Sequence, residues 1–272
     1  MKKRISTIIL ILVFLLGLSL LLYPTISNYW NERHQSKAIA SYVHDVENLS
    51  QLKRGKLLQD ATDYNRYIST LGNQWHVTDE HRAKYLKQLD ISGNGIMGYI
   101  EIPQISCSLP IYHGTDESVL QIAVGHLEGT SLPVGGNSSH CVLSGHRGLP
   151  SANLFTDIDQ LVPGDTFTLN VLDLTLTYEV FEILTVLPQD VTSLRIETNK
   201  DLCTLVTCTP YGINTHRLLV RARRIENPEE ETTVRVTSDA LQIEPVIVAP
   251  IIAVPMLLVL FVVLILHPKK KK

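Results

Sequence analysis

The chain has 272 residues, of which 44% are hydrophobic, and its formal net charge is −3. The charge is unevenly spread, because the two ends carry seven of the 24 Lys and Arg residues. The segment between two long apolar stretches holds the other 17 against all 27 Asp and Glu, a net charge of −10. This segment of about 220 residues can bury a sizeable core, chiefly in one domain. Its acidity argues against nucleic acid as a partner, because phosphates need a basic surface.

The first predicted element is an apolar run from Ile5 to Tyr23, which follows the basic run Lys2-Lys3-Arg4. At about 1.5 Å per residue, such a helix is long enough to cross the hydrocarbon core of a bilayer. The residues after it lack the small-residue pair of a signal-peptide cleavage site. We therefore predict a retained transmembrane signal anchor over residues 5–23, with residues 1–4 as a cytoplasmic tail.

A helical N-terminal extension is predicted next, over residues 32–90. The segment is polar and has no proline, and its apolar residues recur at helical spacings, as at Tyr42, Val46, Leu49 and Leu52. Two or three helices fit this pattern.

The turn signal Ser92-Gly93-Asn94-Gly95 marks a change of character, after which short apolar or alternating runs take over through residues 91–226. Two helical turns are expected within this part, at 116–124 and 152–161. Seven or eight strands fit a closed barrel, so the predicted fold class is mainly β with short helices, the helical extension and two flanking transmembrane helices. The predicted strands cover residues 97–102, 108–112, 141–144, 166–171, 174–187, 202–208 and 218–225.

The C-terminal part is predicted to return to the membrane. Residues 227–245 are acidic and turn-prone, as in a linker, and residues 246–266 are as apolar as the first span. Pro250 and Pro255 do not exclude a span, because membrane helices tolerate proline. The basic tail 267–272 then follows. Since basic residues flank the outer end of each span, we predict a two-pass protein in the cell membrane with both termini cytoplasmic and the middle outside.

Four cysteines lie between the spans, and Cys208 differs from the other three. It ends an apolar run that Pro210 then breaks, which places the thiol near an exposed rim. Cys107, Cys141 and Cys203 sit inside apolar runs and are expected to be buried small hydrophobic residues. Cys203 and Cys208 are five residues apart in one strand, so their side chains point to opposite faces and cannot form a disulfide without breaking the strand.

Arg217 opens the run that follows Cys208 after a short loop. Consecutive strands joined by a short loop are usually antiparallel neighbours, so Cys208 and Arg217 are expected to lie side by side. Arg221, Arg223 and Arg224 are read as surface charges. Five of the ten histidines fall in helical or tail segments, which leaves His113, His126, His140, His146 and His216 as candidates for a base. By position the main rivals are His146, after the run 141–144, and His216, beside Arg217. The residues alone do not choose between these two.

The run Thr204-Leu205-Val206-Thr207-Cys208 resembles the active-site strand of the sortases, membrane-anchored cysteine transpeptidases of Gram-positive bacteria. The resemblance extends from about Gly95 to Arg224 and is greatest to the pilus-building class C branch. It implies a sortase-type barrel and selects His146 as the base. By this resemblance Cys208 attacks a threonine carbonyl, His146 moves protons, Arg217 stabilises the oxyanion, and no metal or organic cofactor is used.

The resemblance implies cleavage of an LPxTG-like motif between Thr and Gly and transfer of the acyl group to a pilin lysine. The expected partners are pilin subunits with sorting signals and acceptor lysines, together with the lipid of the cytoplasmic membrane. Two alternatives remain, a sortase that anchors proteins to cell-wall peptide and a non-catalytic scaffold that docks pilins. One feature departs from many pilus sortases: the Asp-Pro-aromatic signature of an active-site lid is missing, and the region near Gly72 to Glu80 offers Trp75 and Asp79 in another order. A lid is therefore expected to be absent or differently made.

Overall fold

The computed structural model describes residues 2–71, 73–75, 78–228 and 255. The chain divides into two compact units, one of Met1–Trp30 with Glu230–Lys272 and one of Asn31–Glu229. Most of the predicted linker, the second apolar stretch 246–266 and the basic tail lie outside the described residues. The predicted second membrane span therefore stays a prediction.

Helix α1 (Lys2–Glu47) begins in the first unit and continues along the chain into the second. Its part from Ile9 onward contains an 18-residue window with a mean hydropathy of 2.6 and is long and apolar enough to cross a membrane. This agrees in length and composition with the predicted anchor at 5–23. The helix does not end where the apolar run ends, because it passes through Pro24 without a break.

Helices α2 (Gln51–Ser69) and α3 (Asp79–Tyr85) follow, and together with the end of α1 they form the predicted helical extension. Side-chain hydroxyls start both helices. The Oγ of Ser50 accepts from the N–H of Lys53, and the Oγ1 of Thr78 accepts from the N–H of His81. These bonds satisfy backbone donors that have no partner within the first turn of a helix.

The extension is packed against the sheet by buried polar contacts as well as by apolar ones. Tyr42 of α1 donates its hydroxyl hydrogen to the carbonyl of Met97 at 3.0 Å and accepts from the N–H of Leu172 at 2.8 Å. Asn65 of α2 accepts from the N–H of Leu132 at 2.6 Å. Tyr42 and Asn65 are buried, so the helices and the sheet share one core.

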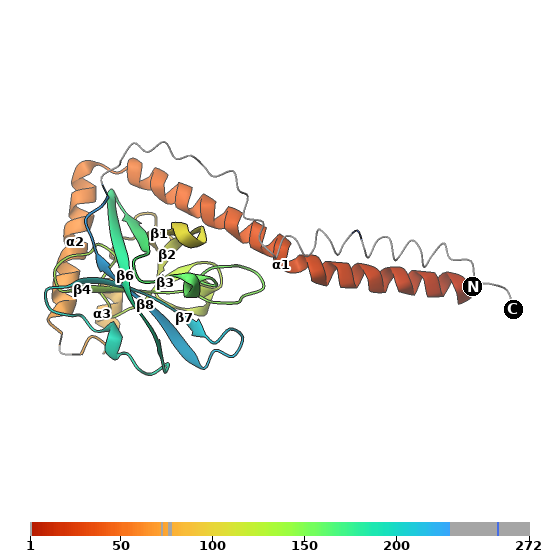
Figure 1. Ribbon diagram of the computed structural model, residues 1–272. Helices are drawn as coiled ribbons and strands as arrows, with labels where there is room; N and C mark the ends of the chain where they lie inside the picture. The colour runs from red at the N-terminus through yellow and green to blue at the C-terminus, as the bar shows by residue number, and fades with distance from the viewer. Residues whose placement is uncertain (1, 72, 76–77, 229–254, 256–272) are drawn as a thin grey trace. The chain divides into compact units, whose positions relative to one another are not determined.

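Eight strands form a closed barrel in the order β1-β2-β3-β4-β7-β8-β6-β5 (Figure 1), which confirms the closed barrel of the predicted fold class. The pairs β2–β3 and β4–β7 are parallel and the others are antiparallel. The strands are β1 (Ile96–Ile102), β2 (Cys107–His113), β3 (Val124–His126), β4 (Ser139–Ser144), β5 (Thr166–Val171), β6 (Leu174–Val186), β7 (Asp201–Thr209) and β8 (His216–Arg224).

Both predicted helical turns were placed too broadly. The first, 116–124, is reduced to the one-turn helix α4 (Glu117–Leu120), because Val124 begins β3 and pairs in parallel with Ile111. The second, 152–161, contains only the 3₁₀ helix η2 (Ile158–Gln160). Two further 3₁₀ helices, η1 (Pro103–Ile105) and η3 (Thr192–Leu194), lie between strands.

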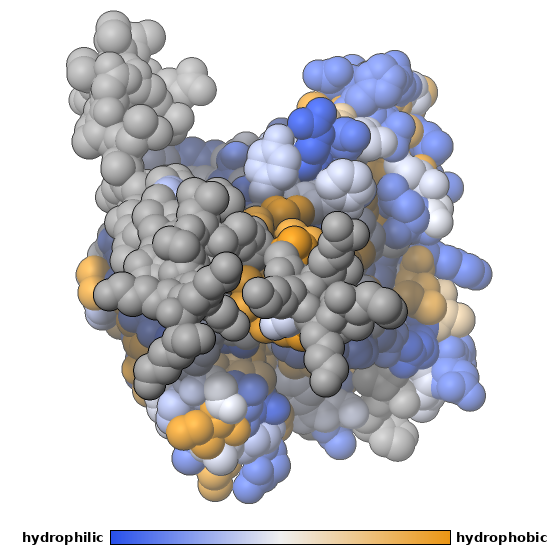
Figure 2. All heavy atoms as spheres, turned by 90° about the vertical axis from the view of Figure 1, so that its right-hand side faces the viewer, coloured by the Kyte–Doolittle hydropathy of each residue, from blue (hydrophilic) through white to orange (hydrophobic). Residues whose placement is uncertain are grey.

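Alternating side chains of the strands fill the barrel. On β7 the residues Cys203 and Leu205 belong to the main core, whereas Val206 joins a smaller apolar group on the other side of the sheet. Figure 2 shows apolar side chains gathered in a few places among hydrophilic ones. The outward face of β7 is therefore a place where side chains can meet a substrate.

Candidate active site

Cys208 lies at the end of β7 on the outward face of the sheet. Cys203 and Leu205, on the same strand, are fully buried in the core. Cys208 is partly exposed, and its thiol is free. Burial raises the pKa of the Cys107 thiol to about 12, so that thiol stays protonated. A thiolate is the reactive form of cysteine, and Cys208 combines a free thiol with access from outside.

Arg217, the second residue of β8, is placed directly beside Cys208 by the antiparallel pairing of the two strands. This confirms the neighbourhood that the short loop predicted. Its Nη1 donates to the backbone carbonyls of Asn214 at 3.3 Å and His216 at 3.1 Å. A guanidinium has five N–H donors, so these two bonds orient Arg217 and leave other donors for a ligand.

His146 comes to the other side of Cys208 through the parallel pairing of β4 with β7. Ser144 pairs with Val206, and the next residue, Gly145, donates its N–H to the Val206 carbonyl at 3.1 Å. The Gly145 carbonyl also accepts from the Thr207 hydroxyl at 2.8 Å. Continuing this register by one residue places His146 level with Cys208.

The path of the chain into His146 requires glycine at position 145. A Cβ built there would lie 2.7 Å from a ring carbon of Phe155, closer than real contacts allow. Phe155 in turn donates its backbone N–H to the His146 carbonyl at 3.0 Å. The buried Phe155 ring therefore fixes both the close approach of the backbone and the position of His146.

The rival histidine, His216, occupies a different position in the ladder. It pairs with Thr209, whereas Cys208 pairs with Arg217. Because successive residues of a strand point to opposite faces, His216 and Thr209 point away from the face that carries Cys208 and Arg217. His216 contacts the hydroxyl of its neighbour Thr215 at 3.0 Å. The strand register therefore favours His146, which the residues alone left open.

One residue at the site was not anticipated from the sequence. Glu117, in α4, has its Oε2 3.5 Å from the Nε2 of His146. The only signal at this position was the helical turn expected at 116–124, which says nothing about an imidazole 29 residues after Glu117. Within the described residues, no group of three or more His, Cys, Asp or Glu side chains has the arrangement of a metal site.

Comparison with known proteins agrees with this geometry. The model of the sortase domain matches residues 100–225. A solved structure of sortase C1 from Streptococcus agalactiae is 51% identical, covers 70% of this chain and 99% of that chain, and has a TM-score of 0.69.

The chain belongs to the sortase family.

Two further relatives are consistent with this. Sortase C from Streptococcus pneumoniae is 39% identical over 70% of this chain and 97% of that chain, with a TM-score of 0.62. Sortase D from Bacillus subtilis is 30% identical over 131 residues, or 47% of this chain, and this match spans 63% of the relative's length. Family and fold identify a cysteine transpeptidase, and the similarity to solved structures is to class C sortases.

An apolar cluster lies on the outer face of this sortase beside Cys208. We call it the outer cluster. Its members come from β4, β6, β7, β8, the β6–β7 loop, the segment between α2 and α3, and the residue after β3. Val206 is two residues before Cys208, and Leu219 is two after Arg217. An extended apolar peptide that ran along this face would end at the thiol. The outer cluster consists of Val142, Leu194 and Leu219, which are buried, and Trp75, Leu127, Leu184, Val186, Val191 and Val206 at its edges.

The β6–β7 loop, residues 187–200, is tied to the sheet by buried polar side chains. His140 of β4 contacts the Arg195 carbonyl through Nδ1 at 2.8 Å and the Thr204 hydroxyl through Nε2 at 2.7 Å. Arg221 of β8 pairs with Glu197 of the loop at 2.6 Å. These contacts hold one wall of the outer cluster in place.

Arg221 corrects a prediction, because it was expected to be a surface charge. Its side chain is only 11% exposed and it pairs with Glu182 as well as with Glu197. The guanidinium also lies over the Phe181 ring, 5.2 Å from its centroid. The sequence could not show that the β6–β7 loop folds over this part of the face.

His140 is expected to make this sortase less stable in acid. Burial lowers the pKa of His140 to about 4 in the folded protein, below the ordinary value of about 6.5. The unfolded chain therefore binds a proton that the folded chain does not, and stability is lost as the pH falls from about 6.5 to about 4. The loss attributable to this group is on the order of 2–3 kcal/mol at pH 4.5.

The measurement is the free energy of unfolding of the wild type and of His140→Gln, each at pH 7 and pH 4.5. The variant is expected to be weaker at pH 7, since two hydrogen bonds are altered, but to lose less stability on acidification. His44→Gln, on the exposed part of α1, is the matched control and should follow the wild type. Equal losses in the wild type and His140→Gln would contradict the assignment.

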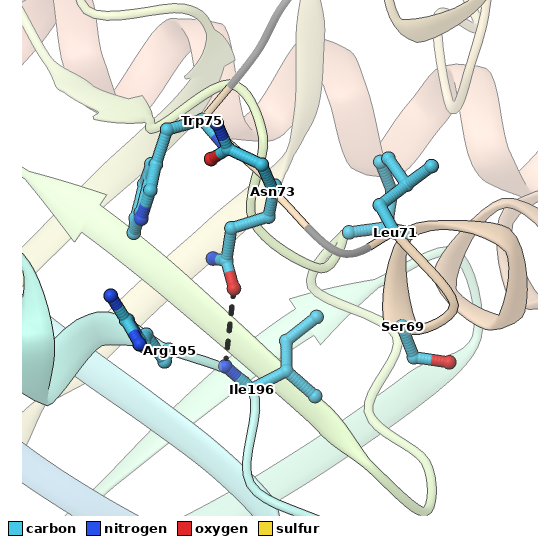
Figure 3. A pocket seen from close by; sticks show the side chains of 8 residues that line it. Ser69, Leu71, Asn73, Trp75, Arg195 and Ile196 are labelled. Carbon is cyan, nitrogen blue, oxygen red and sulfur yellow. Dashed lines mark hydrogen bonds between the residues drawn. The ribbon is translucent and has the colours of Figure 1, made fainter.

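The segment 73–75 lies against the buried members of the outer cluster and the β6–β7 loop. Trp75 packs against the outer cluster, and the side-chain amide of Gln74 accepts from the N–H of Ile196 at 3.3 Å and donates to the Leu194 carbonyl at 3.5 Å. Figure 3 shows Trp75 and Arg195 at a cavity of about 410 Å³, with Ser69 and Leu71 at its other side. A lid was expected to be absent or to be built without the Asp-Pro-aromatic signature. The contacts of segment 73–75 with the β6–β7 loop favour the second expectation.

We expect Gln74→Ala combined with Trp75→Ala to raise kcat/KM for cleavage of a sorting-motif peptide by roughly threefold or more. The reason is that a groove that is covered for part of the time has an apparent affinity equal to its intrinsic affinity multiplied by the fraction of time that it is open. Removing the cover raises that fraction. Trp30→Ala, which changes an exposed tryptophan of α1, is the control and should leave the rate unchanged. A rate that falls in the double variant would show that Trp75 helps to bind the peptide.

Proposed function

We propose that this sortase is a membrane-anchored class C transpeptidase that cleaves an LPxTG-like motif between Thr and Gly and joins the acyl group to a pilin lysine. The observation that supports this best is the adjacency of β4, β7 and β8 in the barrel. This adjacency supports a site in which Cys208 has the His146 imidazole on one side and the Arg217 guanidinium on the other. The pilin substrate is inferred from the similarity to class C sortases, one of which is described in terms of pilin substrate specificity.

The reaction is proposed to begin with attack of the Cys208 thiolate on the threonine carbonyl. Arg217 donates hydrogen bonds to the carbonyl oxygen as negative charge develops there. His146 gives a proton to the departing glycine amine, and a thioester remains on Cys208. The outer cluster would receive the apolar residues of the motif, since it leads along the face to the thiol.

We propose that the catalytic domain lies outside the cell membrane and that both termini are cytoplasmic. The N-terminal helix supports one membrane anchor, because it is long and apolar enough to span. The second span is supported by the apolar composition of residues 246–266 and by the basic residues at both ends of the chain.

The test is mass spectrometry of the full-length protein in detergent after incubation with LPxTG-like peptides and no amine acceptor. The expected result is an acyl adduct on Cys208 whose mass corresponds to the peptide up to and including its threonine. An adduct on another cysteine, or peptide cleavage without any adduct on Cys208, would contradict the assignment. Addition of a pilin domain should then convert the adduct into an isopeptide-linked product.

A further inference from the structure

The proposed reaction has a second substrate, an amine, and Glu117 is suitably placed to bind it. The carboxylate is 70% exposed, and its Oε2 lies 3.5 Å from the Nε2 of His146. Its other oxygen, Oε1, accepts from the side-chain amide of Gln121 at 2.5 Å. Glu117 is thus held with one oxygen toward the catalytic imidazole and remains open to solvent.

Among the described residues, Glu117 forms no ion pair with a lysine or an arginine. The nearby guanidiniums have other partners: Arg82 pairs with Asp116 and Glu128, and Arg147 pairs with Asp159. The hydrogen bond from Gln121 lowers the pKa of the Glu117 carboxyl, and His146 lowers it further. An ionised carboxylate therefore faces the site, and only an imidazole is paired with it.

The two sides of Cys208 differ in charge. Because β7 lies between β4 and β8, His146 and Arg217 flank the thiol from opposite sides. The lysine side chain arrives as an ammonium ion, which Arg217 repels and Glu117 attracts. The Nε2 of His146 is shielded from solvent and, apart from the approach of the Glu117 Oε2 at 3.5 Å, has no polar partner among the described residues. An amine that enters from the Glu117 side would therefore meet the carboxylate and the imidazole together.

We propose that Glu117 binds the ammonium group of the acceptor lysine and directs it to the His146 side of the acyl enzyme. This inference rests on the proposed function. The ammonium loses one proton to solvent, and the resulting amine attacks the thioester carbonyl, so that the C–N bond forms and the C–S bond breaks. His146 takes the second proton, and Cys208 leaves as a thiolate.

The experiment measures how the acyl enzyme divides between transfer and hydrolysis. Full-length wild type and Glu117→Gln, in detergent, receive an LPxTG-like peptide and one of two acceptors, Nα-acetyl-lysine amide or hydroxylamine, which is uncharged at neutral pH. In Glu117→Gln the ratio of transfer to hydrolysis is expected to fall about two- to fivefold with the lysine probe, the range for one exposed ion pair. With hydroxylamine the ratio stays unchanged. At about 1 M salt, where charges are screened beyond ~3 Å, the difference with lysine shrinks.

Asp116→Asn is the matched control, because Asp116 is an equally exposed carboxylate that faces Arg82 instead of His146. Its transfer ratio should equal that of the wild type; a fall as large as in Glu117→Gln would show a general effect of surface charge and overturn the inference. Equal losses with both acceptors would show that Glu117 acts only through His146, and an unchanged ratio would show that it does not bind the amine. A wild type that leaves the peptide uncleaved would overturn the proposed function itself.

Discussion

Replacing Cys208 by alanine is expected to lower kcat/KM for sorting-motif cleavage to background, a loss of about 10⁴-fold or more. The physical reason is that no other described cysteine combines exposure with a place beside an imidazole and a guanidinium. Cys141 and Cys203 are buried in the barrel core, and burial raises the pKa of Cys107 to about 12. The measurement is peptide cleavage by the full-length protein, with adduct formation followed by mass spectrometry.

Cys203→Ala is the matched control, since Cys203 is on the same strand but points into the core, opposite Cys141 on β4. Its activity should stay within about twofold of the wild type, while its stability falls by about 1 kcal/mol from the lost packing. If Cys208→Ala still produced covalent high-molecular-weight polymer in cells that lack other sortases, the Cys208 thiol would not be the nucleophile. The result would then favour the alternative of a non-catalytic scaffold that docks pilins.

Local patterns were enough to predict the parts of the site that depend on strand alternation. The strand ending at Cys208, its antiparallel neighbour starting at Arg217 and the opposite directions of Cys203 and Cys208 all follow from a period of two and a short loop. The structure has the antiparallel pairing of Cys208 with Arg217 and the inward side chain of Cys203, although each strand extends one residue further, to Thr209 and from His216. The assignment of roles to Cys208, His146 and Arg217 stays a proposal, supported by the register and by the family.

Features that depend on distant pairing could not be predicted in this way. Strand β3 is only three residues long and exists because Val124 pairs with Ile111 in parallel, which leaves no local pattern in the sequence. The same holds for Glu117, which reaches His146 only because α4 and the end of β4 meet in space. Arg221 looked like a surface charge because its partner Glu197 lies on a loop whose fold the sequence does not indicate.

The choice of His146 over His216 shows how a long-range pairing decides what local reasoning leaves open. Both histidines adjoin the ends of strands, and His216 is closer to Cys208 along the chain. The parallel pairing of β4 with β7 brings His146 level with Cys208, while His216 pairs with Thr209 on the alternate face. The side of the sheet on which an imidazole lies therefore matters more than its separation in sequence.

We accordingly expect His146→Ala to reduce kcat/KM for peptide cleavage by about 10²–10⁴-fold, the usual contribution of a general acid–base group. His216→Ala should stay within about twofold of the wild type, because its ring points away from the face of the thiol. Melting temperatures of the two variants are compared first, so that a loss of folding is not read as a loss of catalysis. If His216→Ala were the more damaging change, the base would come from the β7–β8 side. The proposal that Glu117 directs the amine to His146 would then fail as well.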